Sequence, residues 1–258
     1  MELERSKNGT RRSTRNLLQS VIAKPTGLQR FKAVLLASSL PMDVIDDFLQ
    51  QHMTVIFPKN TFIFNNGTPG DVIYWVRAGF VDVLSRDPQK GNLIIEIATS
   101  GDLLGFMDFV DPGSGCRQIF DARARTRCEI GLLTRDRIDL ALQQLSPADL
   151  VSLGEHINDW WSEKIEYWVK FLALSARERL ELVLTRLGEK CGVHDTLGTL
   201  IAPKFSHEDF ALMIGSSRPM VSRLLTEMEA QGRLSLRDRR YILHKAPGVS
   251  GSRVPAHK

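Results

Sequence analysis

Residues 205–231 read FSHEDFALMIGSSRPMVSRLLTEMEAQ, and this stretch decides the architecture of the C-terminal part of the chain. Ser206 can cap a short helix that runs to Ile214, and Gly215 then breaks it. Ser217 can cap a second helix over 218–231, with Pro219 tolerated in its first turn. Two short helices about a glycine turn are typical of a helix-turn-helix, and a plain helical hairpin is the alternative.

The second helix of this pair has an apolar and a polar side. The apolar side, which we expect to be buried, consists of Val221, Leu224, Leu225 and Met228. The polar side carries the residues that we expect to contact double-stranded DNA, namely Ser217, Arg218, Ser222 and Arg223. Arg can pair with guanine O6 and N7 in the major groove, and Ser can contact a base or a phosphate.

Two β-type runs around a basic turn follow the helix pair, at 234–236 and 241–243. This pattern predicts a hairpin, which would be the wing of a winged helix-turn-helix. Arg239 and Arg240 lie in the turn, and we expect them to contact DNA phosphates.

Upstream, apolar residues recur in steps of three and four between Leu150 and Leu174, which predicts a long helix over 147–174. We expect this helix to pair with its copy in a second subunit. The predicted dimer seam consists of Leu153, Ile157, Trp160, Lys164, Tyr167 and Phe171. A second apolar stripe lies beside the seam, at Trp161, Ile165, Trp168 and Leu172. We expect that stripe to cover the chain's own N-terminal domain, and a helix buried inside a single subunit is the alternative.

The N-terminal half contains many short β-type runs between residues 55 and 133, separated by turn residues such as Asn65-Asn66-Gly67. Close spacing of short strands favours an antiparallel barrel or jelly roll. The expected fold class is therefore α+β, with an N-terminal jelly roll, a long helix and a C-terminal winged helix-turn-helix. The expected divisions are a disordered basic arm (1–27), a sensor domain (28–146), the dimerisation helix (147–174), a DNA-binding domain (175–246) and a disordered tail (247–258).

Composition and charge limit the function classes. No apolar run is long enough to span a bilayer, and the polar N-terminus has no apolar signal-peptide core, so we expect a cytoplasmic protein without a membrane partner. Residues 1–30 carry seven basic and two acidic side chains, 31–174 carry thirteen and nineteen, and 175–258 carry fourteen and nine. Basic ends around an acidic middle indicate that the ends meet a polyanion, and a solvated basic surface is the alternative.

Over about residues 31–245, the chain resembles the family of the cyclic-AMP receptor protein and the fumarate–nitrate reduction regulator. The resemblance is carried by three blocks in the family order, at 57–83, 101–105 and 217–225. It implies a homodimer with a cyclic-nucleotide-binding-type barrel and winged-helix DNA readers. A palindromic operator, and RNA polymerase if the protein is an activator, would then be its partners. Family members often have Glu where this chain has Pro219, so the preferred half-site is expected to differ at one base pair.

The resemblance also places an effector pocket, with the candidate residues Gly105, Phe106, Met107, Arg117, Gln118, Trp161 and Ser162. Family members that bind cyclic AMP follow this Gly with Glu, and here Phe106 follows it. They place Arg and then Ser or Thr where this chain has Gln118 and Ile119. We therefore expect that cyclic AMP is not the effector, and an apolar effector, a different nucleotide or no ligand all remain open. A cyclic-nucleotide-responsive regulator with an atypical pocket is the alternative function.

The pattern of cysteine and histidine predicts no iron–sulfur cluster and no metal site. The first cysteine is Cys116, whereas iron–sulfur members of the family carry a cysteine cluster near the N-terminus. A haem group remains open, because His52 and His156 are present beside Cys116.

The competing class of function is a nucleotide-regulated enzyme such as a hydrolase. The run 113–115 lacks the Gly-x-Ser-x-Gly spacing of a nucleophile elbow, and Gly67 and Gly70 open no helix that would bind a phosphate. We therefore expect no enzymatic activity and no catalytic residues.

Overall fold

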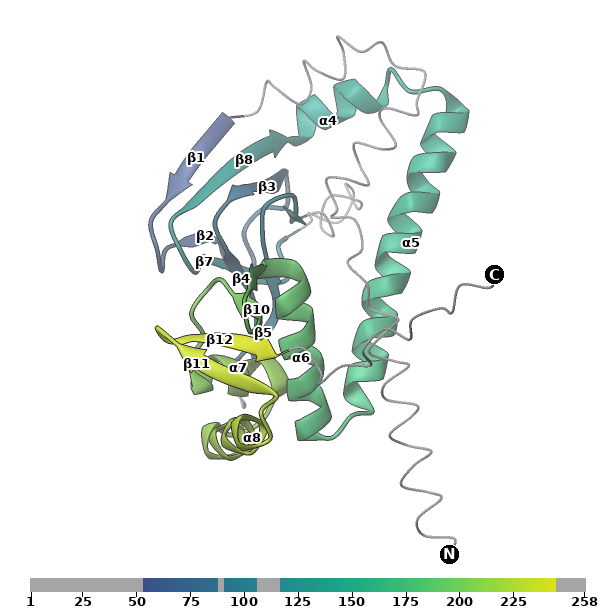
Figure 1. Ribbon diagram of the computed structural model, residues 1–258. Coiled ribbons are helices and arrows are strands. Elements are labelled where there is room, and N and C mark those ends of the chain that lie inside the picture. Colours follow the sequence, from purple (N-terminus) through teal and green to yellow (C-terminus); the bar gives the residue numbers. More distant parts are fainter. Residues whose placement is uncertain (1–52, 88–90, 106–116, 245–258) are drawn as a thin grey trace, which may run out of the picture.

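A computed structural model of the chain describes residues 53–87, 91–105 and 117–244. Within these ranges, the N-terminal domain is a barrel whose eight described strands form two antiparallel four-stranded sheets, with the orders β1-β8-β3-β6 and β2-β7-β4-β5 (Figure 1). The strands are β1 (Met53–Phe57), β2 (Phe62–Phe64), β3 (Val72–Ala78), β4 (Val81–Asp87), β5 (Gly91–Ala98), β6 (Leu103–Leu104), β7 (Asp121–Ala124) and β8 (Cys128–Thr134). The predicted antiparallel jelly roll is confirmed.

The barrel closes around small and β-branched side chains. Val76, Val81, Ala122, Ala124 and Ile130 are fully buried between the sheets, where alternate residues of each strand point inward. The turn between β3 and β4 requires glycine, because a Cβ on Gly79 would lie 2.5 Å from the carbonyl oxygen of Arg127. The backbone of Gly79 also has a φ of 93°, which side chains disfavour.

Two helices lead out of the barrel along the chain. α4 (Arg135–Leu142) follows β8, and α5 (Pro147–Leu172) then runs down one side of the molecule (Figure 1). Ser146 begins α5 with a capping box that it forms with Asp149, and Pro147 occupies the first helical turn. The long helix predicted for this region is therefore present.

The C-terminal domain packs three helices against a small sheet. Ser175 caps the first helix as its spacing to Glu178 predicts. The elements are α6 (Ala176–Cys191), β9 (Gly192–Asp195), β10 (Gly198–Ile201), α7 (His207–Ile214), α8 (Arg218–Ala230), β11 (Leu234–Arg237) and β12 (Arg240–His244). The predicted wing is confirmed as the β11–β12 hairpin, and it belongs to a four-stranded sheet of order β11-β12-β10-β9.

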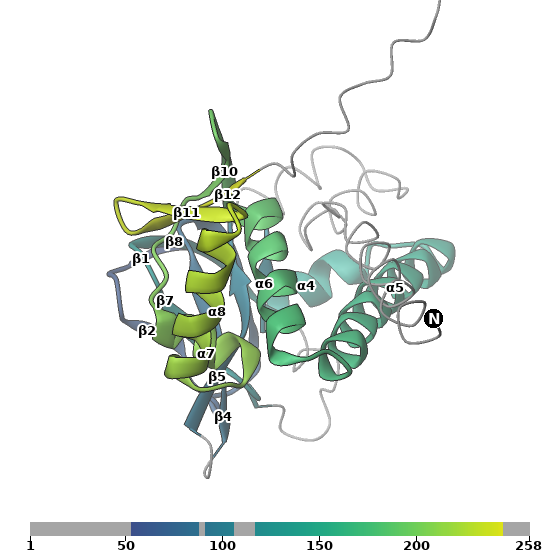
Figure 2. The ribbon, with the colours of Figure 1, turned by 60° about the horizontal axis from the view of Figure 1, so that its bottom comes forward.

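The two domains share a hydrophobic core. Leu84, Ile94 and Ile97, on β4 and β5 of the barrel, join one cluster with buried residues of α6, α7 and α8. Figures 1 and 2 both show β5 next to α7, on the side of the barrel that faces the C-terminal domain. The barrel and the helix-turn-helix therefore meet through a buried surface and not only through the connecting chain.

Several sequence predictions lie outside the described residues. These are the basic arm over 1–27, residues 28–52 of the expected sensor domain, the tail over 247–258, and the pocket candidates Phe106 and Met107. Within the described ranges, no helix is long and apolar enough to cross a membrane. The same ranges hold no group of three or more His, Cys, Asp or Glu residues arranged to bind a metal ion.

Candidate nucleic-acid interface and effector pocket

Local capping positions the helix-turn-helix as the sequence predicts. Ser206 caps α7, and its side chain accepts a hydrogen bond from the backbone of Asp209. Gly215 ends α7 in the left-handed conformation, with a φ of 62°, which Gly adopts at little cost. Ser217 caps α8 and accepts from the backbone of Met220. Two helices joined by a tight turn result, with the start of α8 presented to solvent.

The two sides of α8 are separated as the sequence predicts. Val221, Leu224, Leu225 and Met228 are buried in the domain core. Arg218 is exposed at the first turn, and Arg223 is exposed along one side of the helix, with 65% of its side chain accessible. The Arg223 guanidinium lies 3.8 Å from the Glu227 carboxylate and donates to the Met220 sulfur. Because these surface contacts are weak, the Arg223 side chain remains available to reach the major groove of DNA.

The serines among the predicted DNA contacts have partners within the chain. The Ser222 hydroxyl lies 2.7 Å from Nδ1 of His207, which joins α8 to the start of α7. The Ser217 hydroxyl holds the N-cap of α8. His207 was absent from the sequence predictions, because nothing in the pattern indicates that it faces the second helix.

The wing turns through Asp238 and Arg239, whose φ angles are 51° and 60°. Such values are those of the tight hairpin turn that matches strand twist. Arg239 is exposed at the tip, whereas Nε of Arg240 donates to the carbonyl oxygen of Ala202 at 2.8 Å. Arg237 forms an ion pair with Asp195 on β9. The tip residue Arg239 is therefore better placed for a phosphate than Arg240.

The expected effector pocket brings together Gly105 and Gln118. A Cβ on Gly105 would lie 2.9 Å from the Gln118 amide nitrogen, and Gly105 has a φ of 76°. Gln118 is only 2% exposed, and its amide nitrogen has no hydrogen-bond acceptor among the described residues. Arg117 is exposed and donates to the Gly67 carbonyl at 2.6 Å, so its charge does not enter the barrel. On α5, Trp161 is half-buried and Ser162 is exposed.

In the C-terminal half of α5, residues of the predicted dimer seam contact their own chain. Phe171 is 4% exposed and lies in the core that the two domains share. Tyr167 packs against the same core, and the Arg186 guanidinium lies 4.1 Å from its ring centre. Lys164 forms an ion pair with Glu96 on β5 at 2.5 Å. The apolar stripe that periodicity assigned to a partner is therefore covered by the barrel and by α6.

Two seam residues in the N-terminal half of α5, Leu153 and Ile157, also contact their own chain. Leu153 is buried against Leu145, and Ile157 packs on the same small cluster. Trp160 lies within α5, and nothing is described of its side chain.

A different apolar face of α5 is exposed to solvent. It consists of Val151, Ile165, Val169 and Leu172, which are 63%, 60%, 63% and 68% exposed. Val151, Ile165 and Leu172 are separated by multiples of seven residues, and exposed Asn158 falls in the same repeat. We call these four residues the α5 outer stripe. Two of its members, Ile165 and Leu172, belong to the second stripe that the sequence pattern assigned to the barrel.

A charged cluster connects the barrel to both long helices. The Glu96 carboxylate on β5 pairs with Lys164 of α5 and with Arg186 and Lys190 of α6, and Lys190 also pairs with Asp102 at 2.9 Å. Burial by itself would raise the pKa of Glu96. The three cations outweigh that effect and hold its pKa well below the usual 4.5.

Because its pKa is lowered by folding, Glu96 should stabilise the protein at neutral pH. That contribution is complete above the unfolded pKa near 4.5 and is lost as pH falls through the folded value. Glu96→Gln should lower the free energy of unfolding at pH 7 by about 2–3 kcal/mol. This is less than the cost of breaking a fully buried ion pair, because the Glu96 side chain is 20% exposed. In urea unfolding, the gap to wild type should shrink below about pH 4.

The matched control for Glu96 is Glu166→Gln. Glu166 pairs with Lys170 at 3.6 Å but is 68% exposed, so its loss should cost less than about 0.5 kcal/mol. A gap between Glu96→Gln and wild type that stayed constant from pH 7 to pH 3 would contradict the assignment of the ionised carboxylate as the stabilising form.

The barrel, the long helix and the winged helix-turn-helix define the class of the protein as a DNA-binding regulator with a cyclic-nucleotide-binding-type sensor. Comparison with protein families agrees, because the cyclic nucleotide-binding domain matches residues 54–144 and the Crp-like helix-turn-helix domain matches residues 178–248. The chain belongs to the CRP/FNR family and is a DNA-binding transcription regulator.

Individual relatives show the same arrangement along most of their length. The CRP-like protein Clp of Xanthomonas campestris pv. campestris (strain B100) is 25% identical over 214 residues, which cover 80% of this chain and 91% of the relative. The solved structure of CLP from Xanthomonas campestris has a TM-score of 0.63 at 22% identity, covering 80% of this chain and all of that one. FixK2 from Bradyrhizobium japonicum has a TM-score of 0.62 at 19% identity, covering 75% and 93%.

Proposed function

We propose that the chain acts as a cytoplasmic homodimer that binds palindromic operators, without enzymatic activity of its own. The observation that carries the proposal is the exposure of Arg218 and Arg223 on α8 together with that of a wing arginine, Arg239. We expect the first two to read bases and Arg239 to contact a phosphate. As an activator, the dimer would also contact RNA polymerase.

The α5 outer stripe supports the dimer part of the proposal. Its residues extend over about 31 Å of helix at 1.5 Å per residue, on a face that the described chain leaves uncovered. A seven-residue apolar repeat on one helix fits the same repeat on a second copy, because both helices then present knobs and holes at matching heights. Exposed Asn158 in the repeat is a polar position of the kind that fixes register in a pair.

We further propose that the domains divide where the capped helices begin. Ser146 and Ser175 start α5 and α6, which favours a sensor domain that ends near 146, a dimerisation helix over 147–174 and a DNA-binding domain over 175–246.

A salt series of gel shifts on the chain's own promoter region tests the proposed DNA binding. Specific binding should weaken as salt rises and should resist competition by random DNA. Equal competition by random and specific DNA at every salt concentration would contradict the proposal.

The pocket residues favour an effector other than cyclic AMP. A buried cyclic phosphate needs a cation or several strong donors, and Gln118 offers one neutral amide group at the expected position. The neighbouring cation, Arg117, is turned outward onto the Gly67 carbonyl. Phe106, the next residue after Gly105 in the sequence, offers no carboxylate for the sugar.

We predict that cyclic AMP does not bind to the purified protein at micromolar concentrations in calorimetry. A deeply buried phosphate without its cation loses several kcal/mol of solvation that nothing in the pocket replaces, roughly a thousandfold or more in affinity. Cyclic di-GMP, to which the structural relative from Xanthomonas campestris is described as responsive, is the second ligand in the same titration. Micromolar or tighter binding of cyclic AMP would contradict the assignment of Gln118 to the phosphate position.

A further inference from the structure

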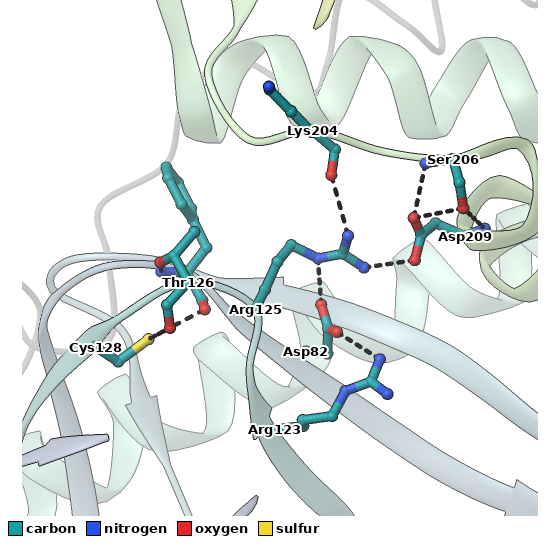
Figure 3. Close-up of polar contacts among 9 residues, drawn as sticks. Asp82, Arg123, Arg125, Thr126, Cys128, Lys204, Ser206 and Asp209 are labelled. Carbon is teal, nitrogen blue, oxygen red and sulfur yellow. Dashed lines mark hydrogen bonds and ion pairs between the residues drawn. The ribbon is translucent and has the colours of Figure 1, made fainter. Parts of the chain in front are cut away.

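One arginine of the barrel contacts the helix-turn-helix directly. Arg125 lies in the short connection between β7 and β8, and 9% of its side chain is exposed. Its Nε donates to Asp82 on β4 at 2.5 Å, and its two terminal nitrogens donate to Asp209 on α7 at 2.9 Å and to the Lys204 carbonyl at 3.2 Å (Figure 3). A single guanidinium therefore connects the sensor barrel to the first helix of the DNA-binding motif.

The acceptors around Arg125 are themselves held in place. Asp209 is the third residue of α7, and its other carboxylate oxygen accepts from the backbone and the hydroxyl of Ser206 at 2.7 and 2.8 Å. Asp82 is 1% exposed and is also paired with Arg123 of β7 at 2.9 Å. The Arg125 guanidinium lies 4.5 Å from the ring centre of Phe205. Both carboxylates thus have fixed orientations, and the planar fork of Arg fits the space between them.

The electrostatics of the contact agree with its geometry. Burial alone would lower the pKa of Arg125, but the hydrogen bonds and charges of Asp209 and Asp82 outweigh burial and raise it. Burial would likewise raise the pKa of Asp209, whereas hydrogen bonds from Arg125 and Ser206 lower it. The group of two carboxylates and two guanidinium ions has no net charge. Loss of Arg125 would therefore leave a buried carboxylate poorly compensated across the domain boundary.

Movement at α7 would be transmitted to α8. The two helices share the core residues Phe210, Ile214 and Val221, and the contact between His207 and Ser222 joins their polar sides. Figure 1 shows α8 on the side of the C-terminal domain farther from the barrel. Arg218 and Arg223 of α8 are exposed in this arrangement. Arg125 therefore contacts α7, which packs on α8, and leaves the exposed arginines of α8 uncovered.

We propose that Arg125 is a positioning residue for DNA recognition, because it holds the helix-turn-helix on the barrel and so fixes the separation of the two recognition helices in the dimer. This inference rests on the proposed dimeric reading of palindromic DNA. Two half-sites on one duplex are read together only if the recognition helices are about one helical turn of DNA apart. A helix-turn-helix domain that is free to tilt on the barrel would allow the dimer to bind half-sites at several separations.

The test is a selection from DNA libraries in which two fixed half-sites are separated by spacers that differ by one base pair. Wild type should prefer one spacer. In Arg125→Ala this preference should fall by about tenfold, the equilibrium effect of losing one charge-assisted contact, while base preference within each half-site stays unchanged. Arg125→Lys keeps the charge but loses the planar guanidinium group, so its spacer preference should lie between those of wild type and Arg125→Ala.

Arg123→Ala is the matched control. Arg123 pairs with the same Asp82, but both residues belong to the barrel, so spacer preference should be retained. If Arg125→Ala does not fold, Asp209→Asn serves instead, because Asn keeps a capping oxygen and loses the charge that faces Arg125. Spacer preference retained in the folded Arg125 variant, or lost equally in Arg123→Ala, overturns the inference. Wild type indifferent to spacer length would overturn the proposed dimeric reading itself, and this inference with it.

Discussion

Ile165→Glu is expected to be a folded monomer that binds operator DNA about 10²–10⁴-fold more weakly than wild type, because the gain from two linked half-site contacts is lost. Ile165 lies at the middle of the α5 outer stripe and is 60% exposed in the single chain, so its replacement disturbs no internal packing. In a symmetric dimer the same residue meets its copy or a near neighbour. Two carboxylates would then be buried in apolar surroundings, which prevents association.

The control for Ile165 is Leu140→Glu on α4. Leu140 is also 60% exposed but lies outside the stripe, so the variant should remain dimeric in sedimentation. Phe171→Glu tests a different contact, because Phe171 is buried in the core of its own chain and its replacement should destabilise the subunit. If Ile165→Glu kept the dimer mass with its fold intact, the dimer surface would have to lie outside the α5 outer stripe.

Arg223→Ala should cost about 1–3 kcal/mol for each bidentate guanine contact that is lost and should flatten the preference at one base pair per half-site. Arg223 is exposed, bound only by weak surface contacts, and lies about one and a half turns after the start of α8. Arg239→Ala at the wing tip should instead weaken all DNA sequences alike and reduce the salt dependence of binding, because phosphates carry no sequence information.

Arg223→Ala should therefore reduce sequence preference, whereas Arg239→Ala should reduce affinity for every DNA sequence. Binding to an operator and to random DNA, each measured over a range of salt concentrations, separates base reading from phosphate contact. If Arg223→Ala weakens both kinds of DNA equally, Arg223 is a phosphate contact, and the assignment of α8 as the base-reading helix fails.

Local chemistry made much of the C-terminal domain predictable from the sequence. The caps at Ser175, Ser206 and Ser217 and the left-handed Gly215 involve residues that are close in the chain, so short patterns locate helix ends. The basic turn of the wing was predictable for the same reason. Strand partners were harder to infer, because β10 pairs with β12 across more than forty residues.

The contacts of the seam residues with their own chain were not foreseen, because periodicity alone does not say which surface covers a stripe. α5 carries apolar residues on more than one side, and both sides have spacing close to three and a half residues. Lys164 was the discriminating residue, because a cation within an apolar stripe requires an acidic partner, and Glu96 is that partner on the chain's own barrel.

The contacts between the domains were not predictable from the sequence. Arg125 and Asp209 are 84 residues apart, and each has the ordinary appearance of a surface charge in its own segment. The resemblance named Gly105 and Gln118 as pocket candidates, and the structure brings these two residues together, whereas the pocket itself stays a prediction. Which way Arg117 turns depends on the fold around Gly67 and could not be inferred from spacing.

The most direct test of the account is selection of bound fragments from genomic DNA by the purified full-length protein, with the footprint of each fragment read at base resolution. We expect an inverted repeat whose half-site centres are about 34 Å, or roughly ten base pairs, apart, each protected through the major groove. Fragments without twofold symmetry, or enrichment no greater than for random DNA, would contradict the proposal that two α8 helices of a dimer read an operator.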